Sequence, residues 1–324
     1  MPHATPCLIA AAAAVASVLA APALAQQFPN KPIRLIAPSS TGSGVDVVSR
    51  TVAVPLSAEL GQQIVVDNRA GAGGNIGADI AAKAAPNGYT IIMGTPSQVI
   101  NAAVYKNLSR NLQKEFAPIS LATSGQYVLL VNNSVPAKTL AQFIALAKAK
   151  PGQIAYGSAG KGNVTHLTGE LFQHAAGVKL LHVPFKGSGP GFVGIMGGEI
   201  PAMVANIAAA IPHMRAGRVH AIASTGAKRA GVAPDLPTFA ESGLKDFEVA
   251  SWFGLLAPQG TPREILARLH AATQKVLSVP AMREQLARQG LDPVGSSPSE
   301  FAAYLDREAD KWGRAVKIAG VQAQ

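Results

Sequence analysis

Two loops rich in glycine and hydroxyl residues have the clearest chemical potential in this chain. The first follows an apolar run at residues 33–37 and reads Ser39-Ser40-Thr41-Gly42-Ser43-Gly44-Val45-Asp46. The second, Gly157-Ser158-Ala159-Gly160-Lys161-Gly162-Asn163, follows the run at 154–156 and precedes Thr165 and His166. Each is typical of a strand whose end loop opens a helix, where free backbone N–H groups and the positive helix end attract anions. The pair predicts a site that holds a carboxylate.

Strands and helices must alternate to position these loops. Short apolar strands are expected at residues 33–37, 64–66, 90–94 and 128–131, with helical stretches between them. Capping boxes predict helix starts at Thr139 with Gln142, at Thr261-Pro262 with Glu264 and at Ser297-Pro298 with Glu300. This alternation indicates an α/β fold with mostly parallel sheets flanked by helices.

The spacing of the two loops predicts two lobes. They are more than a hundred residues apart and are expected to follow strands of separate sheets, so the ligand cleft is expected between the lobes. The chain would cross near residues 120–126 and 248–253. Lobe 1 would then comprise residues 26–123 and 250–324, and lobe 2 residues 124–249.

Other interpretations of the glycine-rich segments fit less well. Residues 71–77 place the last glycine one position late for a dinucleotide fingerprint, and Lys161 is followed by Gly162 rather than the Ser or Thr of a P-loop. A tight strand-to-helix connection with an N-cap would also need Gly and Ser. The presence of a second loop of the same type favours ligand binding over this purely structural interpretation. Asp46 would repel a carboxylate, so a role in neutralising the helix dipole or contacting ligand through water is expected.

The His and Ser residues that could bind a metal or catalyse a reaction do not occur in known sequence motifs. His166, His174, His182 and His213 do not pair as H-E-x-x-H and do not cluster with carboxylates, so no metal or cofactor is expected. No serine has the flanking glycines of a nucleophile elbow. A secreted carboxylate-processing enzyme and a receptor that feeds a sensor remain alternatives, since a triad assembled in space leaves no sequence signature.

The N-terminal segment predicts export from the cytoplasm. Residues 8–24 form an Ala, Val and Leu run that ends in Ala23-Leu24-Ala25, which predicts a signal peptide over residues 1–25 and a periplasmic mature protein. Cys7, the only cysteine, would leave with it. The net charge of +10 is dispersed and aromatic residues make up 5%, which argues against nucleic acid and favours steering of small anions.

Ordered motifs along the mature chain resemble one receptor family. They are Phe28-Pro29-Asn30-Lys31-Pro32-Ile33-Arg34, Asp67-Asn68-Arg69-Ala70-Gly71-Ala72-Gly73-Gly74-Asn75-Ile76-Gly77, Pro86-Asn87-Gly88-Tyr89-Thr90, Tyr156-Gly157-Ser158, His166-Leu167-Thr168-Gly169-Glu170-Leu171-Phe172, His182-Val183-Pro184-Phe185-Lys186-Gly187, Pro212-His213 and Trp252-Phe253-Gly254-Leu255. The chain resembles the substrate-binding proteins of tripartite tricarboxylate transporters, the Bug family of periplasmic receptors.

The resemblance implies a type II periplasmic-binding-protein fold that captures a small mono- or dicarboxylate for membrane transporter subunits. It also implies a monomeric protein that is not an enzyme. Carried over by position, the expected ligand-binding residues are Ser40, Thr41, Gly42, Ser43, Gly44, Asp46, Thr95, Ser97, Ser158, Ala159, Gly160, Gly162, Asn163, Thr165, His166 and Asn206. Many relatives have Asp where this chain has Ala205. The loss of that acid favours a plain organic acid over an amino acid.

Overall fold

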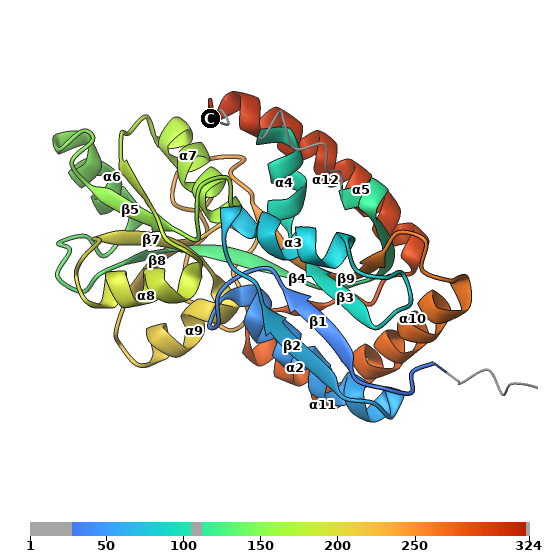
Figure 1. Ribbon diagram of the computed structural model, residues 1–324. Coiled ribbons are helices and arrows are strands. Elements are labelled where there is room, and N and C mark those ends of the chain that lie inside the picture. The colour runs from blue at the N-terminus through green and yellow to red at the C-terminus, as the bar shows by residue number, and fades with distance from the viewer. Residues whose placement is uncertain (1–27, 105–111, 322–324) are drawn as a thin grey trace, which may run out of the picture.

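The computed structural model describes residues 28–104 and 112–321 (Figure 1). The predicted signal peptide and Cys7 lie outside the described residues. Within the described ranges, none of the helices combines the length and the apolar character needed to cross a bilayer.

The first half of the sheet is built from three parallel strands. Strand β1 (Ile33–Ala37) lies between β2 (Ile64–Asn68) and β3 (Thr90–Gly94). The helices that follow them are α2 (Gly44–Leu60), α3 (Asn75–Ala82), which comes after the short 3-10 turn η1 (Ala72–Gly74), and α4 (Pro96–Val104). Every side chain of β1 except Arg34 is buried, as expected for a strand covered on both faces.

Two strands connect the halves. After the short helix α5 (Leu112–Glu115), the long strand β4 (Phe116–Val131) pairs with β9 (Ala250–Pro258) up to residue 126 and with β7 and β8 from Tyr127 onward. Strand β9 pairs in turn with β3. Thus β4 carries the chain from one half of the sheet to the other, and β9 brings it back (Figure 1).

The second half contains β5 (Ala155–Ser158), β6 (Leu181–Pro184), β7 (Ala202–Asn206) and β8 (His220–Ser224). Strand β5 pairs in parallel with β6 and β7. Its helices are α6 (Leu140–Ala149), α7 (Val164–Ala176), α8 (Ser188–Met196) and α9 (Ile207–Arg215). Both predicted loops therefore lie where a strand leads into a helix: β1 into α2, and β5 into α7.

The C-terminal segment returns to the first half. Helices α10 (Arg263–Ser278) and α11 (Pro280–Arg288) pack near α2, and strand β10 (Asp292–Pro293) pairs with β4. Helix α12 (Pro298–Ile318) runs along the outside of α4 and reaches α7 (Figure 1).

Most predicted strands form where the pattern indicates. The strands at 33–37 and 90–94 have the expected bounds, whereas the strand expected at 128–131 is the end of the longer β4. The prediction of mostly parallel sheets is wrong at the centre of the sheet, which is mixed. Because β4 leaves the first half and β9 returns to it, these two strands must run antiparallel.

Two of the three predicted caps are confirmed. Ser297 and Glu300 form a full capping box at α12, and the Thr139 hydroxyl accepts a hydrogen bond from the Gln142 N–H at α6. The predicted box at Thr261 is wrong. The Thr261 hydroxyl donates instead to the carbonyl of Pro258, and Pro262 itself occupies the N-cap position of α10.

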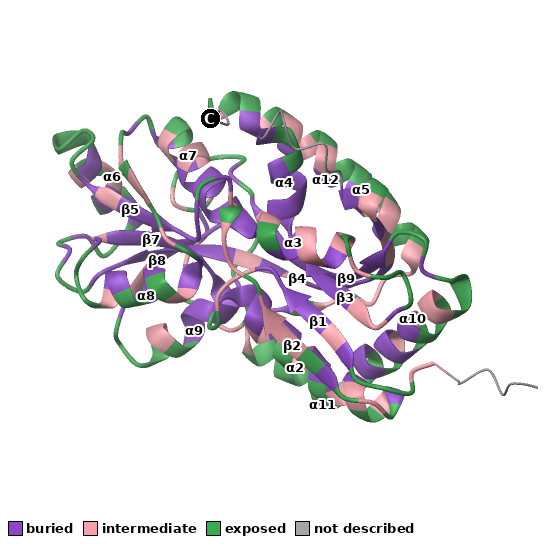
Figure 2. Ribbon diagram, viewed as in Figure 1, coloured by how far each residue is buried: buried purple, intermediate pink, exposed green. Residues whose placement is uncertain are grey.

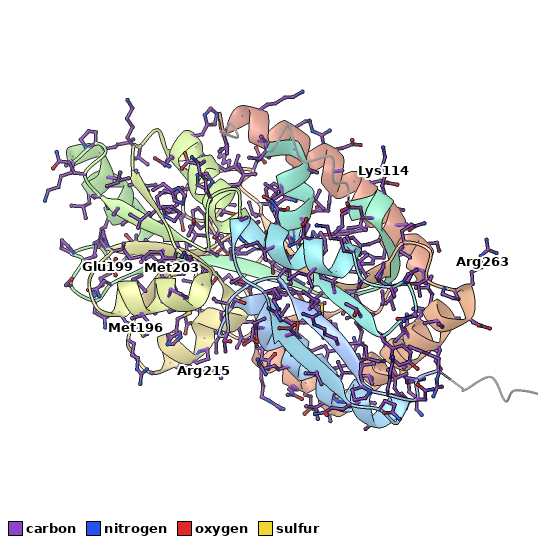
Figure 3. The ribbon with its side chains drawn as sticks, viewed as in Figure 1. Lys114, Met196, Glu199, Met203, Arg215 and Arg263 are labelled. Atoms are coloured by element: carbon purple, nitrogen blue, oxygen red, sulfur yellow. The ribbon has the colours of Figure 1, made fainter. Side chains whose placement is uncertain are left out.

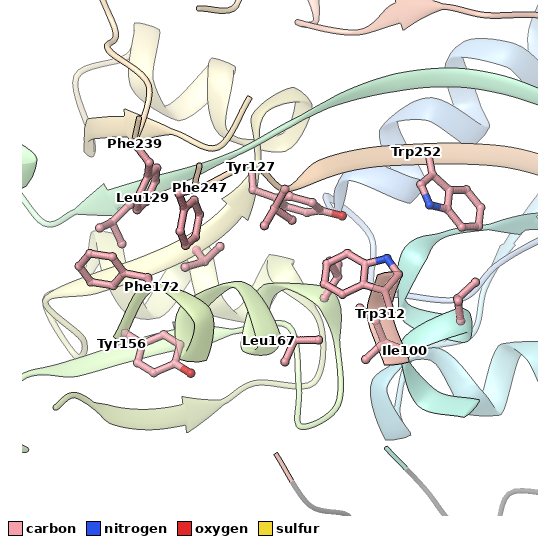
Figure 4. Close-up of a cluster of buried hydrophobic side chains, with 14 of the residues drawn as sticks. Ile100, Tyr127, Leu129, Tyr156, Leu167, Phe172, Phe239, Phe247, Trp252 and Trp312 are labelled. Atoms are coloured by element: carbon pink, nitrogen blue, oxygen red, sulfur yellow. The ribbon is translucent and has the colours of Figure 1, made fainter. Parts of the chain in front are cut away.

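Most residues of the strands are buried, and the helices bury the faces that lie toward the sheet (Figure 2). Figure 4 shows Trp252 of β9 and Trp312 of α12 in one cluster of buried side chains. Both donate their indole N–H groups to the same carboxylate oxygen of Glu308, at 2.8 Å each. Glu308 is 5% exposed. A buried carboxylate that accepts two hydrogen bonds ties the C-terminal helix to the returning strand.

Candidate functional site

A cavity lies where the two halves of the sheet meet. Its volume is about 420 Å³, open solvent included. Its walls come from both halves: Pro38, Ser39, Ser43, Gly44, Val45, Thr95, Ser97 and Phe253 from the first, and Tyr127, Ala159, Asn163, Val164, Thr165, Ser188 and Asn206 from the second. The cavity has the size to enclose a small molecule rather than a polymer.

Five helices begin at this cavity. Ser43, Asn163 and Asn206 are the N-cap residues of α2, α7 and α9, Ser188 is the first residue of α8, and Thr95 and Ser97 flank the start of α4. The first N–H groups of a helix have no partner within it, and the helix dipole places partial positive charge there. Five such ends around one cavity make a strongly anion-attracting site.

The start of α2 presents the most open donors. The Ser43 hydroxyl accepts from the Asp46 N–H at 3.3 Å, and the Ser43 N–H itself donates to the carbonyl of Ser40. The N–H groups of Gly44 and Val45 make no hydrogen bond to any other described residue, and both residues line the cavity. An anion placed here would receive two adjacent N–H donors.

Asp46 does not face the cavity. One of its carboxylate oxygens accepts the Gly42 N–H at 2.9 Å, and the other accepts Arg50 Nε at 2.9 Å. Gly42 needs its positive φ of 78° to turn the loop, which suits glycine. The predicted residue thus supports the loop from behind, and its charge is neutralised by Arg50.

The loop after β5 is held by a parallel set of contacts. The Asn163 side chain accepts from both the N–H and the hydroxyl of Thr165, at 3.0 Å each, and the Thr165 hydroxyl accepts the Ala159 N–H at 2.9 Å. Beneath the loop, the buried Ser158 hydroxyl contacts Nε2 of His182 at 2.7 Å and the Gly160 backbone. These contacts place Ala159, Asn163 and Thr165 on the cavity wall.

His166 lies behind this loop. Its ring stacks on that of His182 with centroids 3.9 Å apart, and its Nδ1 accepts the Gly162 N–H at 3.3 Å. Burial, then the positive charge of Lys161, lowers the pKa of His166 to about 4. For His182, burial, then His166 and Lys161, lowers the pKa to about 3. Both rings are therefore neutral near pH 7 and act as loop supports. No cluster of three or more potential metal-ligating side chains occurs in the described ranges.

Half of the sequence-predicted ligand-binding residues line the cavity, and the other half lie around it. Ser43, Gly44, Thr95, Ser97, Ala159, Asn163, Thr165 and Asn206 line it, whereas Ser40, Thr41, Gly42, Asp46, Ser158, Gly160, Gly162 and His166 do not. Of the second group, Thr41 is exposed and its hydroxyl contacts Asn68, while Ser40 accepts a hydrogen bond from the other half.

Sequence reasoning missed the apolar part of the wall. Tyr127 and Phe253 come from the two connecting strands, and Val45 and Val164 follow predicted loop residues directly. Ser188 could have been found from the glycines around it, which are typical of a helix start. The prediction that used Ala205 is not supported, since Ala205 packs fully buried in a hydrophobic cluster and not on the cavity wall.

Among the residues that the structure describes, the lining contains no Asp, Glu, Lys, Arg or His. Tyr127 is the lining residue with an ionisable side chain, and burial, together with the nearby negative charge of Glu308, raises its pKa well above the usual range. General acid–base catalysis near pH 7 needs a group whose pKa lies near the working pH. The wall is therefore suited to binding by hydrogen bonds and dipoles.

Several contacts join the two halves across the cavity mouth. The Gly189 N–H donates to the Ser40 hydroxyl at 3.1 Å, and the Val164 N–H donates to the Ser97 hydroxyl at 3.2 Å. Gly44 lies so close to Asn206 that a Cβ atom at Gly44 would be 2.7 Å from three of its side-chain atoms. The structure thus shows the halves closed on each other.

Comparison with known proteins identifies the family. Residues 48–321 match the family described as "Tripartite tricarboxylate transporter family receptor". The chain belongs to this receptor family. The protein BugT of Bordetella pertussis is 34% identical over 306 residues, which cover 94% of each chain. The predicted resemblance to Bug receptors is thereby confirmed.

Solved structures of similar proteins share the fold. The periplasmic binding protein BugD superposes with a TM-score of 0.88 at 31% identity, covering 92% of this chain and 100% of BugD. Rpa4515 of R. palustris with adipate gives 0.87 at 34% identity (90% and 98% covered), and MatC of Rhodopseudomonas palustris with bound malate gives 0.85 at 32% identity (89% and 100% covered). The predicted periplasmic-binding-protein fold is confirmed.

Proposed function

We propose that this receptor captures a small mono- or dicarboxylate in the cavity between its halves and delivers it to membrane subunits of a tripartite tricarboxylate transporter. The observation that carries the proposal is the convergence of five helix N-termini on a cavity without charged side chains. Such a wall stabilises an anion through N–H donors and dipoles, and it offers no counter-charge to a cation.

The contacts support a two-part mode of binding. One carboxylate would accept the free N–H groups of Gly44 and Val45, with the hydroxyl of Thr95 or Ser97 within the same wall. The carbon chain would lie against Tyr127 and Phe253. A hydrogen bond to a charged group contributes about 1.5–3 kcal/mol, so several of them, less the ordering cost, reach micromolar affinity, about 8 kcal/mol.

Relatives support the class of ligand. The two similar structures named above hold adipate and malate, both small dicarboxylates. The absence of an acidic residue from the described lining disfavours an amino group on the ligand. We therefore propose a plain organic acid rather than an amino acid as the ligand. This proposal rests on the whole cavity wall and not on Ala205.

Delivery requires opening and closing. We propose that residues 26–123 with 250–324 and residues 124–249 move as two lobes about β4 and β9. The contacts from Gly189 to Ser40 and from Val164 to Ser97 form only when the lobes meet. Because helix starts from both lobes surround the cavity, the anion interacts with all of them only in the closed form, and so it favours closure.

Export is the remaining part of the proposal. We propose that a signal peptide is cleaved after Ala25 and that the mature protein acts as a monomer in the periplasm. The apolar run at residues 8–24 and its small-x-small end support this assignment. N-terminal sequencing and light scattering of the exported protein test it; a retained leader or a stable dimer would contradict it.

The central test is a thermal-shift screen of the mature chain after unfolding, removal of ligand and refolding. Mono-, di- and tricarboxylates are compared with their neutral amides and with amino acids. We expect an acid, but not its amide, to raise the melting temperature in proportion to RT ln(1 + [L]/Kd). Equal shifts with the amides, or none with any acid, would overturn the proposal.

A charge placed on the cavity wall gives a second test. Asn163→Asp keeps an oxygen for the Thr165 N–H, and Asp caps a helix as well as Asn does. It adds a negative charge that costs a bound carboxylate about 3 kcal/mol at a separation of about 5 Å and an effective dielectric of 20, or roughly 100-fold in affinity. Asn87→Asp, at an exposed turn with the same type of N–H contact, is the matched control and should bind normally.

A further inference from the structure

A second hollow lies beside the connecting strand β4, between the C-terminal ends of α9 and α11. It measures about 1270 Å³ including open solvent, and shares no lining residue with the ligand cavity. Its walls are Gln126, Arg215, Lys228, Arg229, Ala230, Gly231, Val232, Ala287, Arg288, Gly290, Leu291 and Asp292. We call this hollow the basic groove.

Positive charge is concentrated there. Four of the twelve lining residues are Lys or Arg, against 28 of 324 in the whole chain, and Asp292 is the one acid of the lining. Arg229 is paired with Glu241, and Arg288 lies 3.6 Å from Glu284. Arg215 and Lys228 are exposed, and no ion pair is found for either within the described ranges. Figure 3 shows Arg215 at the end of α9, extending outward.

The groove is assembled from both lobes. Residues 215–232 belong to one proposed lobe and residues 287–292 to the other, with Gln126 at the crossing point. At Gly290, a Cβ atom would lie 2.8 Å from Cγ1 of Val232 and 3.1 Å from Cγ2 of Ile207, so the two sides are in close contact. A change in the angle between the lobes must therefore alter the width of the groove.

The floor of the groove is closed by Gln126. Its amide group donates to the Lys228 carbonyl at 2.8 Å and so ties the connecting strand to the segment that carries the exposed Lys228 and Arg229. Cations along the rim of a groove match an extended chain that carries carboxylates.

We propose that the basic groove docks an acidic segment of a partner protein, and that it does so best when the lobes are closed on carboxylate. Under the proposed function this partner is a membrane transporter subunit, and only its identity rests on that function. A lipid surface fits less well, because none of the exposed large apolar residues in the described ranges lines the groove.

The test measures binding of a fluorescent Glu-Ser repeat peptide to the carboxylate-saturated mature protein by anisotropy. The triple variant Arg215→Gln, Lys228→Gln, Arg288→Gln removes three groove cations. Its control, Lys148→Gln, Lys179→Gln, Arg263→Gln, removes three exposed cations elsewhere, of which Arg263 lies at the far end of the molecule (Figure 3). Net charge is then equal in the two variants.

We expect the groove variant to bind the peptide about tenfold more weakly than the control variant. Wild-type protein should bind it more tightly with carboxylate than without. Equal weakening in both variants, peptide binding that ignores carboxylate, or a groove-dependent attachment to anionic lipid vesicles rather than to the peptide would overturn the inference. Both variants should keep wild-type carboxylate affinity, so a failure of the ligand screen remains separate from a failure of docking.

Discussion

Gly44→Ala is the substitution that tests lobe closure most directly. Gly44 opens α2 in one proposed lobe, and Asn206 caps α9 in the other. A Cβ atom at position 44 would lie 2.7 Å from Cβ, Cγ and Oδ1 of Asn206, at least 0.7 Å closer than the 3.4 Å of ordinary contact (3.4 − 2.7 = 0.7). The added methyl group therefore fits only if the lobes separate.

The size of the effect follows from overpacking. Inserting a methyl group into a close-packed contact costs about 1–3 kcal/mol. In the proposed two-lobe motion the contact between Gly44 and Asn206 is lost on opening, so this cost would fall on closure and raise Kd for carboxylate by about 5- to 150-fold. The free protein should lose no stability, since alanine is favoured over glycine in a helix by about 0.5–1 kcal/mol.

Calorimetric titration of the mature protein with the acid found in the screen measures Kd, and thermal melting of the ligand-free protein measures stability. Gly313→Ala is the control, because Gly313 is also helical and has open space around its Cβ position. A methyl group at residue 44 could also touch the ligand directly. The double variant with Asn206→Gly separates the two causes, since it removes all three atoms that the methyl group would meet.

The reasoning is refuted if Gly44→Ala binds carboxylate with wild-type affinity. It is also refuted if the double variant shows no recovery relative to Asn206→Gly alone, because the clash would then involve the ligand and not closure. Glycine at an N-cap costs only a few tenths of a kcal/mol relative to Asn, so the background of the cycle stays folded.

Two further predictions concern stability. Glu308→Ala leaves the indole N–H groups of Trp252 and Trp312 without their acceptor and should lower the free energy of unfolding by about 2–6 kcal/mol in urea titrations, with Glu308→Gln less damaging; equal losses would exclude the acceptor role. The pKa values of His166 and His182, about 4 and about 3 in the folded protein against 6.5, mean that the unfolded chain binds more protons below about pH 6.5. The melting temperature should therefore fall as pH drops from about 6.5 toward 4, and replacing both histidines with Gln should flatten that slope, whereas an unchanged slope would assign it to other groups.

The elements predicted best from sequence are those whose pattern is local. The run at 33–37 ends in a Gly and Ser loop, so both the strand and the start of α2 can be located from consecutive residues. Strand β4 could not be predicted in full. Its middle carries Ser120, Thr123, Ser124 and Gln126, which break any apolar alternation, and its length is fixed by pairing with distant β9 and β7.

The candidate site divides in the same way. Loop residues such as Ser43 and Asn163 are expected from their place in the glycine- and hydroxyl-rich loops and from the family resemblance, and in the structure both are N-cap residues. Tyr127 and Phe253 carry no such signature, since each is an ordinary strand residue whose place on the cavity wall depends on how two halves of the sheet meet. Ser158 supports the loop, whereas Thr165 lines the cavity. The sequence pattern cannot distinguish these two roles, because both residues carry a hydroxyl group and belong to one motif.

The division of charge between surface and cavity explains how one receptor can both attract and release an anion. A net charge of +10 raises the local concentration of anions over a distance of about 10 Å, set by the salt of the medium. The described cavity wall, however, holds no Lys or Arg, so under the proposed function a bound carboxylate would be held by dipoles and N–H groups that come from both halves. An arginine would keep its ion pair when the proposed lobes open, whereas this set of donors would be divided by the opening itself. Affinity would then depend on closure, and any partner that separates the halves would also release the ligand.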